Sequence, residues 1–181
     1  MSPKARLRAL VPLGAMLVAC VATGPSAPSI ASTPALRVAS TDCTSKQLVW
    51  HTASKTTYTS YPAPGSEECI QYSGCKYEGQ FMACGGKHPL SWVQSHNVVS
   101  VFPNFAAMKL HDLCLRSGTN TIVATAYDTC ADSDCDGCCS KNAMPSGNLI
   151  DVESFTDTRW GVQDGQIEWA DLGPTTGDGC N

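Results

Sequence analysis

Three things are scarce in this chain of 181 residues: aromatic side chains, basic charge and long apolar stretches. Aromatics make up 7% of the residues, so a core has to be built from Val, Ile, Leu and cross-links. The formal net charge is −4, which is the opposite of the basic excess that nucleic-acid binding requires. Beyond the N-terminal region no apolar run is long enough to cross a bilayer, so we expect a soluble, monomeric mature domain.

The N-terminal region has the pattern of an export signal. Lys4, Arg6 and Arg8 are followed by an apolar segment from Ala9 to Ala22, which is too short for a comfortable membrane span. We therefore expect a signal peptide at 1–22, a flexible linker rich in Ser, Pro and Ala at 23–41, and one domain at 42–181. This organisation predicts an extracellular or cell-envelope location.

Two processing sites are compatible with this leader. The segment Leu17-Val18-Ala19-Cys20 has the form of a bacterial lipobox, in which Cys20 carries a lipid and tethers the protein to a membrane. The alternative is an ordinary signal peptide that is cut after Ala31. The sequence leaves both open.

The cysteine count supports export. Eleven cysteines are present, and an even set of ten remains when Cys20 is set aside. Such a set in an exported domain of this size predicts five disulfides, although the pairing stays open. The ten are Cys43, Cys69, Cys75, Cys84, Cys114, Cys130, Cys135, Cys138, Cys139 and Cys180. Since bridging direct neighbours strains the peptide, Cys138 and Cys139 are expected to have different partners.

Metal binding is the competing interpretation of the cysteine-rich loop. Zinc ribbons use two separated Cys-x-x-Cys pairs, whereas the loop from Cys130 to Cys139 contains one. Alternating acids at Asp132, Asp134 and Asp136 resemble the start of a calcium loop, but the position of the distal glutamate holds another residue. We therefore expect disulfides, a solvated acidic loop, and neither metal nor cofactor.

The apolar pattern predicts a small β-barrel. Short β-branched segments separated by turn residues predict strands at 47–58, 97–102, 113–116, 121–128 and 167–170. The turn Ser117-Gly118-Thr119-Asn120 predicts a hairpin. Asp151 is expected to cap a short helix that runs through Thr158 and ends at Gly161. The segment from Glu67 to Pro89 is expected to be a cross-linked loop without a helix.

A set of motifs in the second half resembles a known superfamily. The segment Thr125 to Cys130 ends in Asp-x-Cys, Cys138-Cys139 follow, and Ile150-Asp151-Val152 leads into Glu153-Ser154-Phe155. This order is similar to the expansin-like double-psi β-barrel, which occurs in expansins, barwin-like proteins, loosenins, family 45 endoglucanases and rare lipoprotein A. The first half matches more loosely. The resemblance implies an all-β, disulfide-rich barrel of six strands with one or two short helices.

The resemblance also implies a groove for extended polysaccharide. Asp128 matches the acid that protonates the glycosidic oxygen in hydrolytic members, so it is the candidate catalytic residue. Candidates for contact with the sugars are Tyr58, Tyr61, Tyr127, Trp160 and Asp151. For the aromatic residues, ordinary packing in the barrel remains the competing interpretation.

The expected activity depends on a second catalytic group. Hydrolysis by the usual route needs two carboxyl groups, and the first strand carries no acid at the place where family 45 enzymes have their base. Glu67 and Glu68 are the nearest substitutes, while His96 and His111 flank the strand on which lytic relatives carry a histidine. The prediction is therefore a protein that binds and loosens cellulose, hemicellulose or peptidoglycan without efficient hydrolysis.

Two alternative functions remain open. The first is a glycoside hydrolase or lytic transglycosylase that uses Asp128 as its general acid. The second is a barwin-like binding module or protease inhibitor, which would present the cross-linked loop from Glu67 to Pro89 to its partner.

Overall fold

The computed structural model describes residues 43–177 and 179–181. The predicted signal peptide, the linker and the lipidation candidate Cys20 lie outside this part of the chain. Among the described helices, none is long and apolar enough to cross a membrane.

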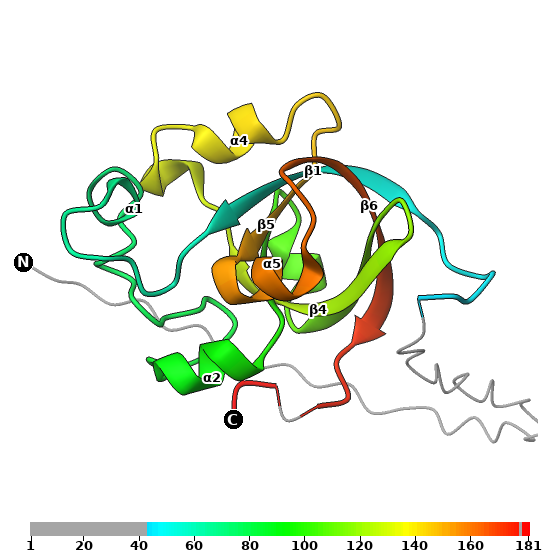
Figure 1. Cartoon of the computed structure of the whole chain (residues 1–181), viewed down its shortest axis with the longest axis horizontal. Helices are drawn as coiled ribbons and strands as arrows, with labels where there is room; N and C mark the ends of the chain where they lie inside the picture. Colours follow the sequence, from blue (N-terminus) through cyan, green and yellow to red (C-terminus); the bar gives the residue numbers. More distant parts are fainter. Residues whose placement is uncertain (1–42, 178) are drawn as a thin grey trace, which may run out of the picture. The chain divides into compact units, whose positions relative to one another are not determined.

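Six strands form a closed barrel in the order β1-β5-β2-β4-β3-β6, which confirms the predicted fold class (Figure 1). Two neighbouring pairs, β1 with β5 and β2 with β4, are parallel, and the other four are antiparallel. The strands are β1 (His51–Tyr58), β2 (Val98–Phe102), β3 (His111–Ser117), β4 (Asn120–Thr129), β5 (Leu149–Glu153) and β6 (Gly165–Pro174).

Alternation along each strand separates the barrel interior from its outer face. On β2, Val99 and Val101 point into the main core, which also holds Ile150 and Val152 of β5. The other face of β2 is buried as well, because Val98 packs in a second cluster with Phe81, and Ser100 lies in a covered cleft. β2 therefore reads as a continuous apolar run, as strands covered on both sides do.

The hairpin between β3 and β4 forms as the turn residues predict. Ser117 pairs with Asn120, and Gly118 adopts a φ of 58°. Such a positive φ costs glycine little, whereas other residues rarely adopt it.

The described residues contain five short α-helices, more than the one or two expected. They are α1 (Glu67–Ile70), α2 (Leu90–Ser95), α3 (Phe105–Met108), α4 (Cys138–Asn142) and α5 (Ser154–Trp160), with a 3₁₀ turn η1 (Asp132–Asp134). All lie in connections between strands. The segment after Glu67, expected to contain no helix, forms α1 because the hydroxyl of Ser66 accepts the amide of Cys69.

The predicted cap of the last helix is wrong. Asp151 lies inside β5, which pairs with β1 on one side and β2 on the other. The helix starts at Ser154, and the Glu153 carboxylate accepts the amide of Phe155 over 2.7 Å. Gly161 ends the helix as expected, with a φ of 69°. Asp151 therefore does not cap this helix.

All ten domain cysteines are paired, and Cys138 and Cys139 have different partners as predicted. The pairs are Cys43–Cys114, Cys69–Cys75, Cys84–Cys180, Cys130–Cys139 and Cys135–Cys138. The loop cysteines that could have formed a zinc site are thus used in bridges.

Candidate functional site

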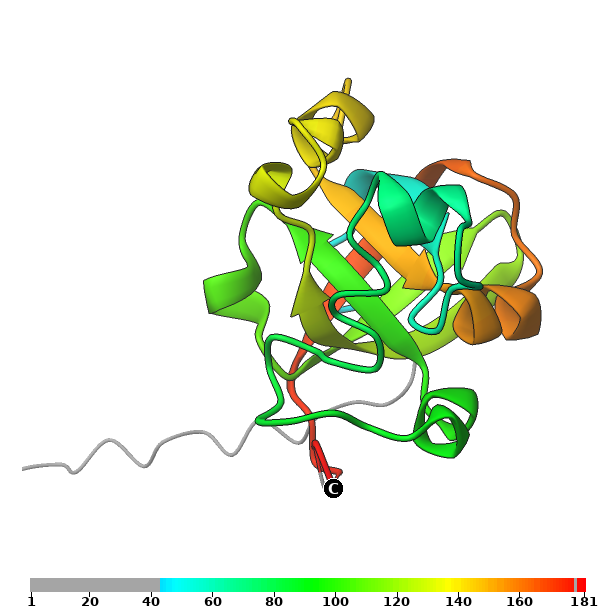
Figure 2. The same ribbon diagram turned by 90° about the vertical axis from the view of Figure 1, so that its left-hand side faces the viewer.

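A cleft of about 770 Å³ opens on one side of the barrel. Its floor is lined by residues of β1, β2, β4 and β5, and its two walls by the segment that contains α1 and the disulfide loop that leads into α4. Figure 2 shows that segment and that loop on the same side of the barrel. The segment from Glu67 to Pro89 therefore forms a wall of the cleft.

Four polar residues from four neighbouring strands form a row across the floor. Thr56 of β1 pairs with Asp151 of β5, and Asp151 pairs with Ser100 of β2. Ser100 in turn pairs with Asp128 of β4. Since adjacent strands are about 4.8 Å apart, the backbones of the two aspartates are on the order of 10 Å apart. The structure thus places Asp151, which the sequence offered only as a sugar contact, as a second carboxyl group beside Asp128.

An irregularity in the ladder between β2 and β4 sets the direction of Asp128. Val99 pairs with Ala126, but the next pair joins Ser100 to Asp128, so Tyr127 is skipped. The extra residue aligns Asp128 with Ser100 on the cleft side. Tyr127 is buried with Phe81 and Trp92 instead.

Asp128 is firmly held by the backbone. One carboxyl oxygen, Oδ1, accepts the amides of Met82 and Thr129, each over 2.9 Å. Burial raises the pKa of Asp128 to about 6, although these two hydrogen bonds act in the opposite direction. The side chain therefore fixes the wall segment around Met82 to β4 while it faces the cleft.

Asp151 is the less constrained of the two acids. Its Oδ1 accepts the hydroxyl of Thr56 over 2.7 Å. Burial raises the pKa of Asp151 to about 7, against the effect of that hydrogen bond, and the charge of Glu68 adds to the rise. A carboxylic acid with this pKa can hold its proton in mildly acidic surroundings and donate it to a bound ligand.

Tyr58 and Glu68 also belong to the polar lining. The hydroxyl oxygen of Tyr58 is buried, and burial together with the charges of Asp128 and Asp151 raises its pKa well above the usual range. Tyr58 therefore stays protonated. Burial raises the pKa of Glu68 too, and Glu68 lines the cleft whereas Glu67 does not.

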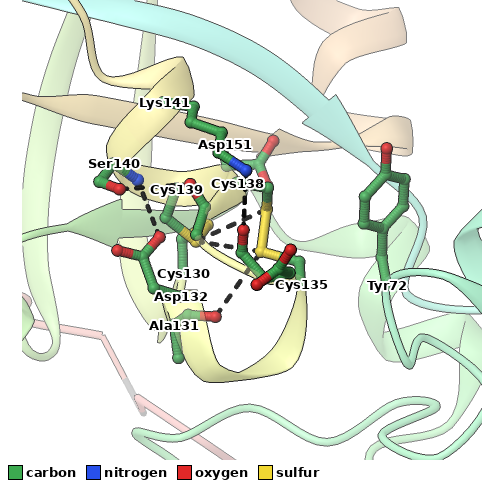
Figure 3. The surroundings of a disulfide bond; sticks show 12 residues. Tyr72, Cys130, Ala131, Asp132, Cys135, Cys138, Cys139, Ser140, Lys141 and Asp151 are labelled. Carbon is green, nitrogen blue, oxygen red and sulfur yellow. Dashed lines mark hydrogen bonds between the residues drawn. A yellow bond between two sulfur atoms is a disulfide. The ribbon is translucent and has the colours of Figure 1, made fainter.

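Two tyrosines that the sequence did not single out lie along the cleft. Tyr72 and Tyr77 line it and are each 40% exposed. Figure 3 shows Tyr72 opposite the Cys135–Cys138 bridge, with Asp151 at the back of the gap. The glycine- and cysteine-rich segment around them has no periodicity, so no local pattern could have revealed their position.

Three of the predicted stacking residues are packing residues. Tyr127 is 4% exposed and Trp160 is 6% exposed, and both belong to core clusters. Tyr61 is partly buried against the second cluster, where its hydroxyl donates to the carbonyl of His88. Of the four aromatic candidates only Tyr58 lines the cleft.

The histidines considered as alternatives lie outside the cleft lining. His96 stacks on Trp92, with ring centroids 4.0 Å apart. His111 faces Asp171 over 3.0 Å on the outer side of β3. Neither can therefore act on a ligand in this cleft.

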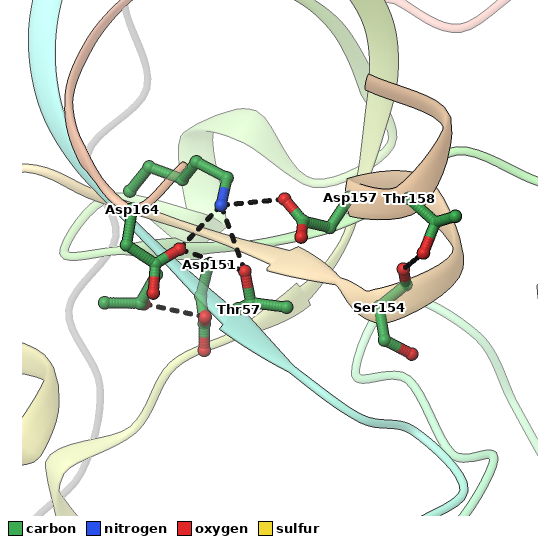
Figure 4. Close-up of polar contacts among 8 residues, drawn as sticks. Thr57, Asp151, Ser154, Asp157, Thr158 and Asp164 are labelled. Carbon is green, nitrogen blue, oxygen red and sulfur yellow. Dashed lines mark hydrogen bonds and ion pairs between the residues drawn. The ribbon is translucent and has the colours of Figure 1, made fainter. Parts of the chain in front are cut away.

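A buried lysine, Lys55, joins Asp157, Asp164 and Thr57, which Figure 4 shows gathered around one ammonium group. Lys55 Nζ contacts Asp164 at 2.6 Å, Asp157 at 2.7 Å and the hydroxyl of Thr57 at 3.0 Å. Its side chain is fully buried. Because Thr57 and Asp164 line the cleft, this network ties the floor to the loop after α5.

No family model and no curated protein matches this chain. Its closed, disulfide-rich barrel of six strands is the architecture that the resemblance to expansin-like proteins implied.

Two solved structures show where similar folds occur. One is an apo expansin of Clavibacter michiganensis, with 14% identity and a TM-score of 0.42 over 71% of this chain and 53% of that chain. The other is the Streptomyces papain inhibitor, with 17% identity and a TM-score of 0.37 over 68% of this chain and 94% of that chain. The matched part of this chain spans about half the length of the expansin structure. Its function has to be argued from the cleft.

Proposed function

We propose that this expansin-like domain is exported, binds an extended cell-wall polysaccharide in the cleft and loosens its packing without efficient hydrolysis. Five disulfides in a domain of this size support an oxidising, extracellular location. The exposed faces of Tyr72 and Tyr77 offer apolar surfaces for sugar rings, and the hydroxyls along β1 offer hydrogen-bond partners.

The observation that carries this proposal is the position and state of Asp151. It lies in the middle of the floor, it is backed by Thr56, and its pKa of about 7 keeps it protonated in a mildly acidic wall. A protonated carboxyl there can donate a hydrogen bond to a glycosidic oxygen or a sugar hydroxyl. Such a bond replaces one between neighbouring polymer chains, which is what loosening requires.

Asp128 takes a supporting role in this scheme, although the sequence singled it out as the acid. One of its oxygens already accepts two backbone amides, which favours the charged form and fixes the side chain. Asp151 accepts one side-chain hydroxyl and is the better proton donor.

Hydrolysis is a second candidate, and the row across the floor favours it. Asp128 and Asp151 flank Ser100 on the same side of the sheet. Inverting glycosidases place their two carboxyl groups about 6.5–9.5 Å apart, with the nucleophilic water beside the base. Asp151 would act as the acid, and Asp128, with the lower pKa of about 6, would act as the base.

One comparison separates the two candidates. The purified domain is incubated with insoluble wall material, and binding, mechanical weakening of the material and release of soluble reducing sugars are measured. Weakening without released sugar, lost in Asp151→Asn, is the expected result. Sugar release that both Asp151→Asn and Asp128→Asn abolish would establish the hydrolase instead. Absence of binding to any wall material would refute both.

A further inference from the structure

The cleft is acidic on all the surfaces that enclose it. Its lining contains five carboxyl groups and, within the described part of the chain, no Lys, Arg or His. The five are Glu68, Asp128, Asp134, Asp151 and Asp164. A concave surface lined by one sign of charge concentrates its field and selects ligands of the opposite sign.

These groups come from separate elements. Asp128 and Asp151 stand on the floor, Glu68 belongs to α1 in one wall, and Asp134 belongs to η1 in the opposite wall. A polymer lying in the cleft therefore meets carboxyl groups beneath it and on both sides.

Among the described residues one of these five acids forms an ion pair with a lysine, although the charges of Lys55 and Lys76 also act on Asp151 and Asp134. Lys55 is buried and shared between Asp157 and Asp164, so Asp164 is the lining acid that it neutralises. Lys141 donates to the backbone carbonyl of Asp136. Lys76 lies 4.6 Å from the centre of the Tyr77 ring, outside the lining.

The aromatic lining is an independent indication of the ligand. The rings of Tyr72 and Tyr77 are accessible, and the face of an aromatic ring attracts both the C–H face of a sugar and a cation. Sugar rings that carry ammonium groups offer both.

We infer that the polysaccharide preferred by this cleft carries free amino groups, as a polymer of glucosamine does. The inference rests on the proposed function and names its substrate class. Ammonium groups on successive sugars would meet Asp134 and Glu68 on the walls, while the rings stack on the tyrosines. Neutral glucans would keep only the stacking and hydroxyl contacts, and polyuronates would be repelled.

A second consequence concerns protons. Burial holds the pKa of Asp128 at about 6 and that of Asp151 at about 7, so both are partly protonated between these values. An ammonium group placed beside Asp128 favours its charged form and expels a proton, whereas Asp151, with the higher pKa, keeps the proton that it donates to the sugar. A neutral oligosaccharide has no such effect.

The test compares soluble hexamers of β-1,4-linked glucosamine, N-acetylglucosamine and glucose by calorimetry with the purified domain at pH about 6, near the lower of the two raised pKa values. The glucosamine hexamer should bind most tightly at low salt. Its advantage should shrink between about 0.01 M and about 0.15 M salt, because the screening length falls from about 30 Å to about 8 Å. Its binding heat, unlike that of the glucose hexamer, should vary with the ionisation enthalpy of the buffer.

A matched pair of variants assigns the effect to the cleft. Asp134→Asn should weaken binding of the glucosamine hexamer by about two- to five-fold, the usual size for one exposed charge, and leave the glucose hexamer unchanged. Asp136→Asn is the control, because Asp136 is exposed in the same loop but does not line the cleft. Its φ of 51° is one that asparagine tolerates.

The outcomes are distinct. Equal or tighter binding of the glucose or N-acetylglucosamine hexamer overturns the preference for amino groups and leaves the proposed function intact. Equal effects of the two loop variants place the charge effect outside the cleft and overturn the inference as well. If no hexamer and no wall polymer binds, the proposed function falls and the inference falls with it.

Discussion

The hydroxyl of Thr56 donates to Oδ1 of Asp151 over 2.7 Å, which joins the parallel strands β1 and β5 in the floor of the cleft. This contact orients an acid that burial keeps protonated near neutral pH. Substitution of Asp151 should therefore affect wall loosening and wall binding differently.

We expect Asp151→Asn to abolish wall loosening, because the amide cannot supply the carboxyl proton. Binding to insoluble wall material should persist, since Tyr72 and Tyr77 are unaffected. Pull-down and weakening assays on the same preparation check this. Asp171→Asn is the control, because Asp171 faces His111 outside the cleft lining. Full loosening by Asp151→Asn would move the mechanism to another residue.

Stability should decrease as the pH rises. The folded pKa values of Asp128 and Asp151, about 6 and about 7, lie above the ordinary aspartate value of about 4. The folded state therefore binds more protons than the unfolded state between about pH 4 and 7, and the free energy of unfolding falls across this window. Below about pH 4 both aspartates are protonated in the folded and in the unfolded protein. Their contribution to the free energy of unfolding is therefore fully present there and no longer changes with pH.

Thermal unfolding of Asp151→Asn checks the sign. The variant cannot ionise at this position, so it should lose much less stability between about pH 4 and 8 than the wild type. At about pH 8 it should be the more stable of the two, by on the order of 1 kcal/mol or more, which corresponds to a few degrees in Tm. Parallel pH profiles for variant and wild type would rule out a buried acid at 151.

Tyr72→Ala and Tyr77→Ala should weaken carbohydrate binding with little change in stability, because both rings are 40% exposed. We expect a loss of about 1 kcal/mol for each ring, or about five-fold in affinity. Trp160→Phe is the contrasting change: it alters a buried core residue, so it should lower Tm and leave the affinity of the folded protein unchanged. Binding and melting curves on the three variants distinguish the groove from the core.

The disulfides should differ in their value to stability. Cys43–Cys114 closes a long loop, with a sequence separation of 71, and Cys135–Cys138 closes a short one, with a separation of 3. Removing the first with paired serines should cost about 4 kcal/mol and removing the second about 2 kcal/mol, according to the loop-entropy relation. Of these two bridges only Cys135–Cys138 lines the cleft. Its removal should therefore weaken ligand binding, although it lowers the stability less than removal of Cys43–Cys114. Denaturant unfolding and binding assays provide the comparison.

Local chemistry explains which features the sequence could reveal. β-branched runs, the Gly118 turn and the terminal Gly161 act through neighbouring residues, and the hairpin, the helix end and every strand except β5 were predicted from them. The use of all ten cysteines in bridges was predicted from their even number and from the expected export. The identity of the pairs does not, because partners such as Cys84 and Cys180 are 96 residues apart.

The site was only partly predictable because its geometry is set by pairing between distant strands. Asp151 looked like a helix cap, since its carboxylate precedes a polar helical segment, but pairing on both sides extends β5 to Glu153. The skipped residue at Tyr127, which turns Asp128 to the cleft, depends on the register against β2. Neither the alternation within β4 nor the motif around Asp128 predicts which residues of β4 pair with β2.

The parallel pairing of β1 with β5 and of β2 with β4 has a kinetic consequence. Thr56, Ser100, Asp128 and Asp151 come from four strands, and Thr56 and Asp151 are 95 residues apart. Parallel neighbours cannot be joined by a tight turn, so these contacts carry a large loop-closure cost and form slowly. A chain that has folded only the β3–β4 hairpin possesses no cleft floor at all. Ligand binding during refolding would thus report the closure of the whole barrel rather than the formation of any single part.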